Sequence, residues 1–316
     1  MTGLATPAAW LYGRAWELRR RGYAAGWLRP ERVNARVVSI GNLTVGGTGK
    51  TTLTIHVARR ARERGLACAI VCRNYRPGPD GLSDEARLYR ERCSDVGLFA
   101  GRTKRELARR AVAEGYRFLC VDDGFSHWRL ERDLDVVLLD AHDPWGGERL
   151  LPAGRLREPR RALQRAGVVV LTRLAANDDP ETLLAAVRPY APGAHFATAR
   201  HRVRGVAWRT GETTERRVRV VTATGHPDAV VASAEEAGLE VTGVARYRDH
   251  HWFHAAEVAA ERMHAKRDRA AVLLTAKDAV RWPAPDGTVP EGVLEVEWEW
   301  VTGAERAERA VFGEEA

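Results

Sequence analysis

A glycine-rich segment between an apolar run and a stretch with helical spacing is the part of this chain best suited to chemistry. Residues 37–52 read VVSIGNLTVGGTGKTT. In a strand–loop–helix order, glycines let backbone N–H groups curl around a phosphate, and the helix N-terminus adds partial positive charge. Lys50 would contact the outer phosphates and Thr51 would hold Mg²⁺. The alternative is a plain glycine turn, but the context favours a nucleotide site.

This segment supplies all the predicted nucleotide-binding residues. They are Thr44, Val45, Gly46, Gly47, Thr48, Gly49, Lys50, Thr51 and Thr52. The usual motif has a glycine at the first of these positions, where this chain has a threonine. The loop glycines and the lysine that the chemistry requires are present.

A second candidate is the apolar run 118–121, which ends in the carboxylates Asp122 and Asp123, followed by glycine. Nucleotide enzymes hold Mg²⁺ or its water shell with carboxylates at such a strand end. Taken alone, a strand that ends in Asp-Asp-Gly is more often a turn. Because a phosphate loop lies upstream, we interpret the pair as serving the metal and the phosphates.

Three further segments each leave two interpretations open. Residues 83–85, Ser-Asp-Glu, are either a helix N-cap or the source of a general base for a hydroxyl nucleophile. Residues 249–251, Asp-His-His, either tune the basicity of an imidazole or are simply solvated. Residues 151–159, bounded by proline and glycine, are either a rigid connector or a loop that touches a phosphate or the metal.

The composition is that of an ordinary globular protein. The 316 residues are 45% apolar and 29% charged, which allows a sizeable core and two domains. The formal charge of +8 is carried almost entirely by arginine, which admits anionic lipid, phosphorylated substrates and nucleic acid as partners. The cysteines are expected to be buried thiols in a reducing cytoplasm.

The N-terminal segment combines aromatic residues with arginines. Residues 7–27 have helical spacing, and Trp10, Tyr12 and Trp16 lie among four arginines. A short helix of this kind fits a membrane interface, and packing on the protein's own core is the alternative. Because the chain has no apolar run of about 18 residues, we expect no membrane-spanning helix.

Apolar runs alternate with arginine-rich helical stretches, which predicts a P-loop NTPase-like α/β fold with a mostly parallel sheet flanked by helices. The expected strands are 36–43, 67–72, 96–100, 118–121, 136–140, 168–171, 219–223, 241–247, 271–275 and 293–298, and the expected helices include 51–64, 104–114 and 159–165. We expect a kinase-like core in residues 1–200, a two-stranded linker in 201–218 and a smaller α/β domain in 219–316.

Together these motifs resemble one family, tetraacyldisaccharide 4'-kinase, over nearly the whole chain. The matching segments are 12–13, 41–51, 84–85, 122–125 with His127, 151–154 with 157–158, 225–227, 249–250 and 275–280. The loop motif, with its threonine in place of the first glycine, is highly specific to this family. The order of the other motifs makes coincidence implausible.

The resemblance implies transfer of the ATP γ-phosphoryl group to the 4'-hydroxyl of a tetraacylated glucosamine disaccharide 1-phosphate in lipid A biosynthesis. Carried over by position, the catalytic residues are Asp84, His250, Lys50, Asp123, Arg102 and Arg157, and the metal ligands are Thr51, Asp122 and Glu158. Asp84 is the candidate base and His250 its partner. We expect these two residues in different domains, so that the site assembles when the domains close over ATP and acceptor.

The family also implies where the protein acts. It makes the N-terminal helix a membrane-surface anchor and places the chain at the cytoplasmic face of the inner membrane of a Gram-negative bacterium. We expect a monomer whose partners are the lipid A disaccharide 1-phosphate and the membrane surface, with ATP and Mg²⁺ as cofactors and no nucleic acid.

The chain departs from the family in one loop near the expected site. Where the family has Arg-Gly-Tyr-Gly, residues 73–76 read Arg-Asn-Tyr-Arg, and Arg76 either narrows this loop or meets a substrate phosphate. Two rival functions are a P-loop ATPase that couples hydrolysis to partner or membrane binding, and a non-enzymatic adaptor. The Asp84 and His250 pair argues against the first, and the retained Lys50 and Thr51 argue against the second.

Overall fold

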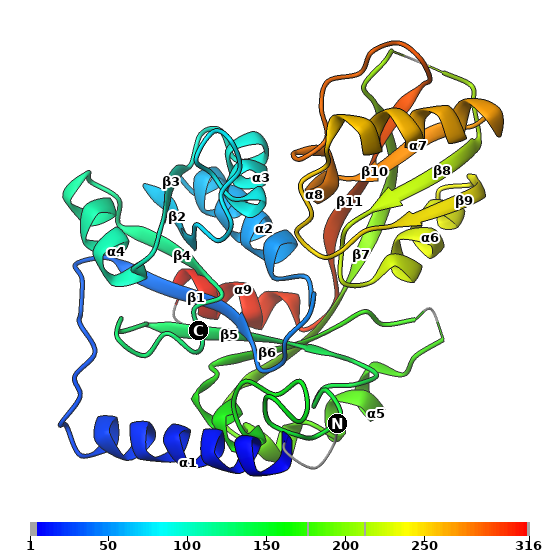
Figure 1. Cartoon of the computed structure of the whole chain (residues 1–316). Helices are drawn as coiled ribbons and strands as arrows, with labels where there is room; N and C mark the ends of the chain where they lie inside the picture. The colour runs from blue at the N-terminus through cyan, green and yellow to red at the C-terminus, as the bar shows by residue number, and fades with distance from the viewer. Residues whose placement is uncertain (1–4, 176, 212, 315–316) are drawn as a thin grey trace. The chain divides into compact units, whose positions relative to one another are not determined.

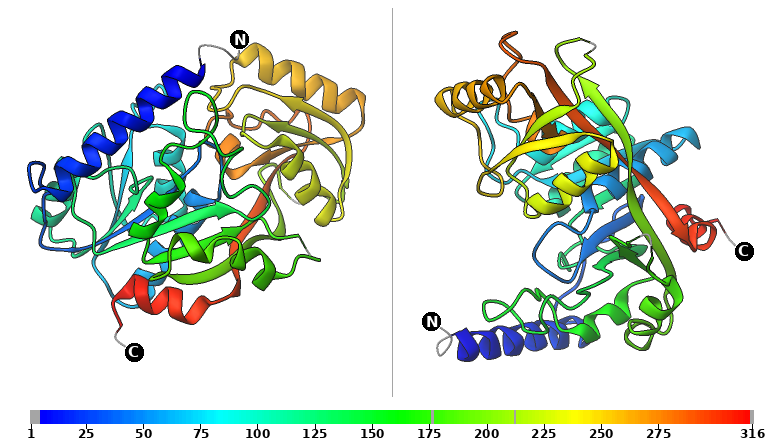
Figure 2. Two further views of the ribbon diagram at one scale, coloured as in Figure 1. Left: turned by 90° about the horizontal axis from the view of Figure 1, so that it is seen from below. Right: turned by 90° about the vertical axis from the view of Figure 1, so that its right-hand side faces the viewer.

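The computed structural model describes residues 5–175, 177–211 and 213–314 and divides the chain into two compact units. The first unit comprises Met1–Arg73, Cys93–Arg200 and Trp298–Ala316, and the second comprises Asn74–Arg92 and His201–Glu297. Figures 1 and 2 show the helices and strands of each unit.

The first unit is built on a parallel sheet with the strand order β3-β2-β4-β1-β5-β6-β7. Its strands are β1 (Arg36–Asn42), β2 (Cys68–Arg73), β3 (Gly97–Gly101), β4 (Phe118–Asp122), β5 (Leu134–Asp140), β6 (Val168–Thr172) and β7 (His195–Trp208). Strands β1, β4 and β6 are buried along nearly their whole length, as expected for a parallel sheet covered on both faces. The predicted α/β fold with a mostly parallel sheet is therefore confirmed.

Helices cover both faces of this sheet. They are α1 (Ala5–Ala24), α2 (Lys50–Glu63), α4 (Lys104–Ala113), α5 (Pro180–Ala185) and α9 (Ala304–Phe312), with the short 3₁₀ helices η1 (Arg160–Arg165) and η2 (Arg188–Tyr190). Leu107 and Ala111 of α4 pack on Val71 and Leu119. Helix α2 contacts β1, β2 and β4 from the other face.

Helix α1 lies against the segments that flank β5 (Figures 1 and 2). Trp16 is 7% exposed and packs edge-on against Trp128, with ring centroids 5.9 Å apart. By contrast Trp10, Leu11 and Leu18 are 64%, 61% and 68% exposed. One face of α1 therefore packs on the core, and another face has exposed apolar side chains. None of the described helices is long and apolar enough to cross a bilayer.

The second unit has the parallel strand order β11-β10-β8-β9. Its elements are α3 (Asp84–Arg92), β8 (Arg217–Thr222), α6 (Pro227–Glu236), β9 (Glu240–Arg246), α7 (Ala255–Arg267), β10 (Ala271–Thr275), α8 (Ala276–Ala279) and β11 (Glu291–Thr302). Val220 packs with α6 and Val221 with α7, and successive strand residues point to opposite faces, so these two helices cover opposite sides of the sheet.

The sequence predicts domains and a linker that follow one another along the chain, and the two units of the structure differ from this in three places. Residues 74–92 belong to the second unit and residues 298–316 to the first. In place of a linker confined to 201–218, β7 and β11 are neighbours in the sheet and each has residues in both units. Pairing between segments this far apart leaves no local pattern in the sequence, so periodicity could not reveal it.

Candidate active site

The phosphate loop joins β1 to α2, in the strand–loop–helix order that the sequence predicts. Residues 43–49 form the loop, and Gly49 at the N-cap of α2 has a φ of 88°, a left-handed conformation that favours glycine. Lys50 opens the helix, with Thr51 and Thr52 in its first turn. The N–H groups of a first helical turn have no partner within the helix and can therefore donate to a phosphate.

Hydrogen bonds fix the shape of this loop. The Asn42 side chain donates to Thr48 Oγ1 at 3.2 Å, and both residues are buried. The Val45 N–H donates to the backbone oxygen of Arg155 at 2.8 Å. The segment 151–159 thus lies beside the phosphate loop.

The two carboxylates at the end of β4 lie near the loop because β4 pairs with β1. Glycine at position 41 permits this approach, since a Cβ there would lie 2.5 Å from the Cβ of Phe125. Asp123 follows β4 with a φ of 49°, and its Oδ1 lies 3.9 Å from the Lys50 Nζ. The structure therefore brings together Lys50 and Asp123, which the sequence assigned to one site.

Three cations surround Asp123. The Arg157 Nη1 donates to both of its carboxylate oxygens at 2.7 Å, and the buried Lys104 ammonium donates to the backbone oxygens of Asp122 and Asp123 at 2.5 and 2.6 Å. Burial raises the pKa of the Asp123 carboxyl, but the charges of Lys50, Arg157 and Lys104 outweigh burial and lower this pKa well below its usual value. Asp123 is therefore an anion that holds two cationic side chains.

Thr51 and Asp122 offer the hard oxygen donors that Mg²⁺ prefers. Glu158, the third predicted ligand, is 2% exposed, accepts a hydrogen bond from Trp128 Nε1 at 3.3 Å and pairs with Arg165 at 2.8 Å. Among the residues that the structure describes, no group of three or more histidine, cysteine, aspartate or glutamate side chains could hold a metal ion. The carboxylate of Glu158 thus contacts an indole and a guanidinium.

Arg102, also predicted for the polar site, has an exposed side chain just after β3. Strands β2 and β4 lie between β3 and β1 in the sheet. Arg102 is therefore at the same carboxyl edge as the phosphate loop, but the structure does not join it to the group around Asp123.

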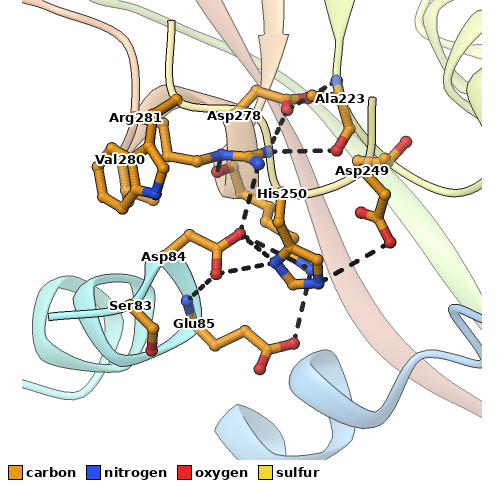
Figure 3. A network of polar contacts seen from close by, with 12 residues as sticks. Ser83, Asp84, Glu85, Ala223, Asp249, His250, Asp278, Val280 and Arg281 are labelled. Atoms are coloured by element: carbon orange, nitrogen blue, oxygen red, sulfur yellow. Dashed lines mark hydrogen bonds and ion pairs between the residues drawn. The ribbon is translucent and has the colours of Figure 1, made fainter. Parts of the chain in front are cut away.

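In the second unit, Asp84 and His250 form a hydrogen-bonded pair (Figure 3). Asp84 opens α3 and is 3% exposed, and the His250 Nδ1 lies 2.9 Å from Asp84 Oδ2 and 3.1 Å from Oδ1. The two residues lie in one unit, which differs from the expectation of two domains, because Asn74–Arg92 belongs to the second unit. The Tyr75 ring stands edge-on to the imidazole, with centroids 6.0 Å apart.

Positive charge surrounds the Asp84 carboxylate. Arg281 Nη1 lies 3.5 Å and Lys277 Nζ 3.9 Å from Asp84 Oδ2. Burial raises the pKa of Asp84, but the hydrogen bond with His250 and the charges of Lys277 and Arg281 outweigh burial and lower the pKa. The carboxylate is therefore ionised at neutral pH, as a group that is to accept a proton must be.

Sequence reasoning missed the residues that support these carboxylates, Lys104 in the first unit and Asp278 and Arg281 in the second. Asp278 is fully buried and accepts hydrogen bonds from Arg281 Nη2 at 2.6 Å and Thr275 Oγ1 at 2.7 Å. This holds Arg281 against Asp84 (Figure 3). The available signal was the spacing of Asp278 and Arg281, since residues three apart on a helix can pair.

Known proteins resemble this chain over nearly its full length. A family model described as tetraacyldisaccharide-1-P 4'-kinase (LpxK) matches residues 1–311. The tetraacyldisaccharide 4'-kinase of Anaeromyxobacter dehalogenans (strain 2CP-1) is 38% identical, over 93% of this chain and 85% of the relative. The enzyme of the same name from Halorhodospira halophila is 35% identical, over 87% of this chain and 82% of the relative.

A solved structure has the same fold. The crystal structure of LpxK from Aquifex aeolicus in complex with ATP aligns with a TM-score of 0.75 and 21% identity, over 98% of this chain and 97% of that one. The matched residues of the family model, 1–311, include the phosphate loop, Asp123 and the Asp84–His250 pair. The chain is therefore a kinase and belongs to the tetraacyldisaccharide-1-P 4'-kinase family.

Proposed function

We propose that this kinase transfers the γ-phosphoryl group of ATP to the 4'-hydroxyl of a tetraacylated glucosamine disaccharide 1-phosphate. The observation that carries the assignment is the Asp84–His250 pair, a buried carboxylate 2.9 Å from an imidazole nitrogen and next to two cationic side chains. Such a pair suits removal of a proton from an acceptor hydroxyl. The names of the relatives supply the identity of the acceptor.

ATP binds at the phosphate loop. The N–H groups of the loop and of the first turn of α2 donate to phosphate oxygens, and the Lys50 ammonium contacts the outer phosphates. Thr51 and Asp122 would hold Mg²⁺, which neutralises phosphate charge when bound. Asp123 orients Lys50 and is itself held by Arg157.

Asp84 serves as the base for the acceptor. It accepts the hydroxyl proton while the hydroxyl oxygen bonds to the γ-phosphorus and the bond from that phosphorus to the ADP oxygen breaks. His250 orients the carboxylate through its Nδ1. Because the transition state of phosphoryl transfer is loose, the hydroxyl loses its proton late, and a carboxylate with a lowered pKa is a sufficient base.

The function is tested with purified lipid A disaccharide 1-phosphate, Mg²⁺ and ATP, with the product identified by mass. The wild-type chain should add one phosphate to the acceptor. Asp84→Asn should slow transfer by roughly a thousandfold while the affinity for Mg-ATP stays within about threefold. His250→Ala should be slower than wild type but active, and the double variant should be little worse than Asp84→Asn because the two residues act as a unit.

The matched control is Asp80→Asn, the same substitution in the same segment, at a carboxylate that pairs with the exposed Arg90 and with Arg87. It should transfer at close to the wild-type rate. ATP hydrolysis that needs no acceptor, and that Asp84→Asn leaves unchanged, would support the rival ATPase and overturn the proposed kinase reaction.

The acceptor carries acyl chains, so the proposed reaction takes place at a membrane surface. The exposed side chains of Trp10, Leu11 and Leu18 on α1 suit contact with lipid, and exposed arginines on the same helix suit anionic headgroups. We infer that a monomer binds peripherally to the cytoplasmic face of the inner membrane through this helix.

A further inference from the structure

Helix α1 carries a second feature at Tyr12, which is 38% exposed. We propose that the Tyr12 hydroxyl is a positioning group of the phosphate centre, so that the helix which meets the membrane also sets the geometry of Arg157 and Asp123. The inference rests on the proposed function and adds to it a residue for the phosphoryl-transfer step.

The contact that carries this inference is one hydrogen bond across the first unit. The Tyr12 hydroxyl donates to the backbone oxygen of Arg157 at 2.7 Å, a contact between residues 145 positions apart. The backbone N–H of Arg157 donates in turn to the Leu43 oxygen in the phosphate loop at 2.7 Å. Residue 157 is therefore held on one side by the phosphate loop and on the other by α1.

The side chain of residue 157 then fixes the charged centre. The Arg157 Nη1 donates to both carboxylate oxygens of Asp123 at 2.7 Å, and Asp123 Oδ1 lies 3.9 Å from Lys50 Nζ. A phosphoryl-transfer site works by placing such charges accurately, and small displacements reduce the rate. The backbone orientation at residue 157, which Tyr12 restrains, therefore influences the position of Lys50.

Tyr12 can restrain Arg157 because α1 is itself firmly packed. Trp16, one turn further along, is buried against Trp128. Arg19 donates to the backbone oxygen of Ser126 at 3.3 Å, and its guanidinium lies 5.2 Å from the centroid of the Trp128 ring. The helix thus bonds to the segments that follow Asp123 and that contain Arg157, and the hydroxyl of Tyr12 sits at a defined place.

The test compares three variants of the full chain in detergent micelles that contain the lipid acceptor. Tyr12→Phe keeps the ring and removes the hydroxyl, so kcat should fall roughly threefold to tenfold, the effect of one lost hydrogen bond, while the KM for the acceptor stays unchanged. Trp10→Ala should raise the KM for the acceptor and leave kcat unchanged. Tyr23→Phe, the same substitution at a residue of α1 that packs against Trp128, is the matched control and should alter neither constant.

A double-mutant cycle with Arg157 separates positioning from general stability. If Tyr12 acts through Arg157, then Tyr12→Phe should cost little further kcat in an Arg157→Ala background. Additive losses, an unchanged kcat for Tyr12→Phe, or a change confined to the acceptor KM would each overturn the inference. Wild-type transfer in the same assay tests the proposed function separately, so a chain that phosphorylates the acceptor with the same kcat with or without the Tyr12 hydroxyl contradicts only the inference about Tyr12.

Discussion

Lys50 is the residue on which the phosphate chemistry most depends, because it opens the helix after the phosphate loop and its ammonium lies 3.9 Å from the anionic Asp123. We predict that Lys50→Ala lowers kcat by roughly a thousandfold, since it removes a charge that stabilises the transferring phosphoryl group. Steady-state transfer assays would measure this. Lys266→Ala, at an exposed position on α7, should leave kcat unchanged. A Lys50→Ala chain with half the wild-type turnover would remove the phosphate-loop assignment.

His127 lies in the segment that follows Asp123, and burial and neighbouring positive charges change its pKa. Burial, and after it the positive charges of Lys104 and Arg132, lower the pKa of His127 from its usual 6.5 to about 4. The unfolded chain therefore binds a proton between these two pH values that the folded chain does not bind. As pH falls through 6.5 toward 4, this difference destabilises the fold.

The predicted consequence is a pH-dependent difference between wild type and His127→Gln. Between pH 7 and about 4 the Tm of the wild type should fall more than that of the variant, because only the wild type carries this histidine. Thermal unfolding at several pH values would measure the difference. Parallel Tm curves over the whole range would mean that the environment of His127 does not lower its pKa.

At the scale of elements, the C-terminal helix α9 is joined to the helix that follows the phosphate loop. Glu308 of α9 lies 3.4 Å from His56 Nε2 and 3.3 Å from Arg60 Nη2 on α2, and 3.1 Å from Nη2 of Arg64, the C-cap residue of α2. Burial raises the pKa of Glu308, but its hydrogen bonds with Arg64, Arg60 and His56 and the charge of Arg60 outweigh burial and lower it. Glu308 is therefore charged and links two helices that are distant in sequence.

We predict that Glu308→Gln destabilises the chain by about 1–2 kcal/mol, since one partly buried carboxylate loses its charge toward three side chains. Urea denaturation at pH 7 would measure the change. Glu305→Gln, at a 77% exposed side chain that pairs only along α9 with Arg309, is the control and should cost less than about 0.5 kcal/mol. The effect of Glu308→Gln should shrink as pH falls below 4.5, the usual pKa of a glutamate, because the unfolded wild-type chain then binds a proton at this residue. The effect should be lost once the pH is below the lowered pKa of the folded chain, where Glu308 is protonated as well.

Elements with strong local patterns could be predicted from the sequence, and elements that depend on distant partners could not. The expected strand at 118–121 and the loop glycines are signals within a few residues, and they led to Asp122, Asp123 and Lys50. The sequence predicts only a two-stranded linker in 201–218 where β7 lies, and it predicts no helix at α9, because β11 and α2, their respective partners, are far away in the sequence. Residues 74–92 could not be assigned to the second unit, since nothing local in that segment records its contacts.

In the candidate site, too, contacts between residues that are distant in the sequence could not be predicted from local patterns. Asp84 and His250 were named as partners only through the resemblance, and the structure brings them within 2.9 Å. The resemblance makes Glu158 a metal ligand, which stays a prediction, and it gives no sign of the contacts that Trp128 and Arg165 make with its carboxylate. A motif gives the type of a residue and its place in the chain, but burial and neighbouring charges decide which group its side chain meets.

At the scale of the whole molecule, some of the many arginines bond to other groups of the chain. Arg36 donates to the backbone oxygens at the end of α9, and Arg262 is 6% exposed and pairs with Glu291. The charge available to an outside partner is therefore smaller than the formal +8 suggests. On α1, Arg14 and Arg21 are exposed near Trp10 and Leu18, and Arg21 is 70% exposed at its side chain.

This arrangement predicts that two kinds of interaction hold the chain on a membrane, with different responses to salt. Exposed arginines attract anionic lipid at roughly 1 kcal/mol each, and salt screens this attraction because the Debye length falls from about 10 Å at 0.1 M to about 3 Å at 1 M. The apolar contact of Trp10, Leu11 and Leu18 is not screened.

In co-sedimentation, binding to anionic vesicles should therefore fall several-fold between these salt concentrations and level off above zero. Trp10→Ala should lower the high-salt plateau, and Arg21→Gln should weaken only the binding at low salt. Binding that ignores salt, or that survives unchanged in both variants, would show that α1 is not the membrane contact.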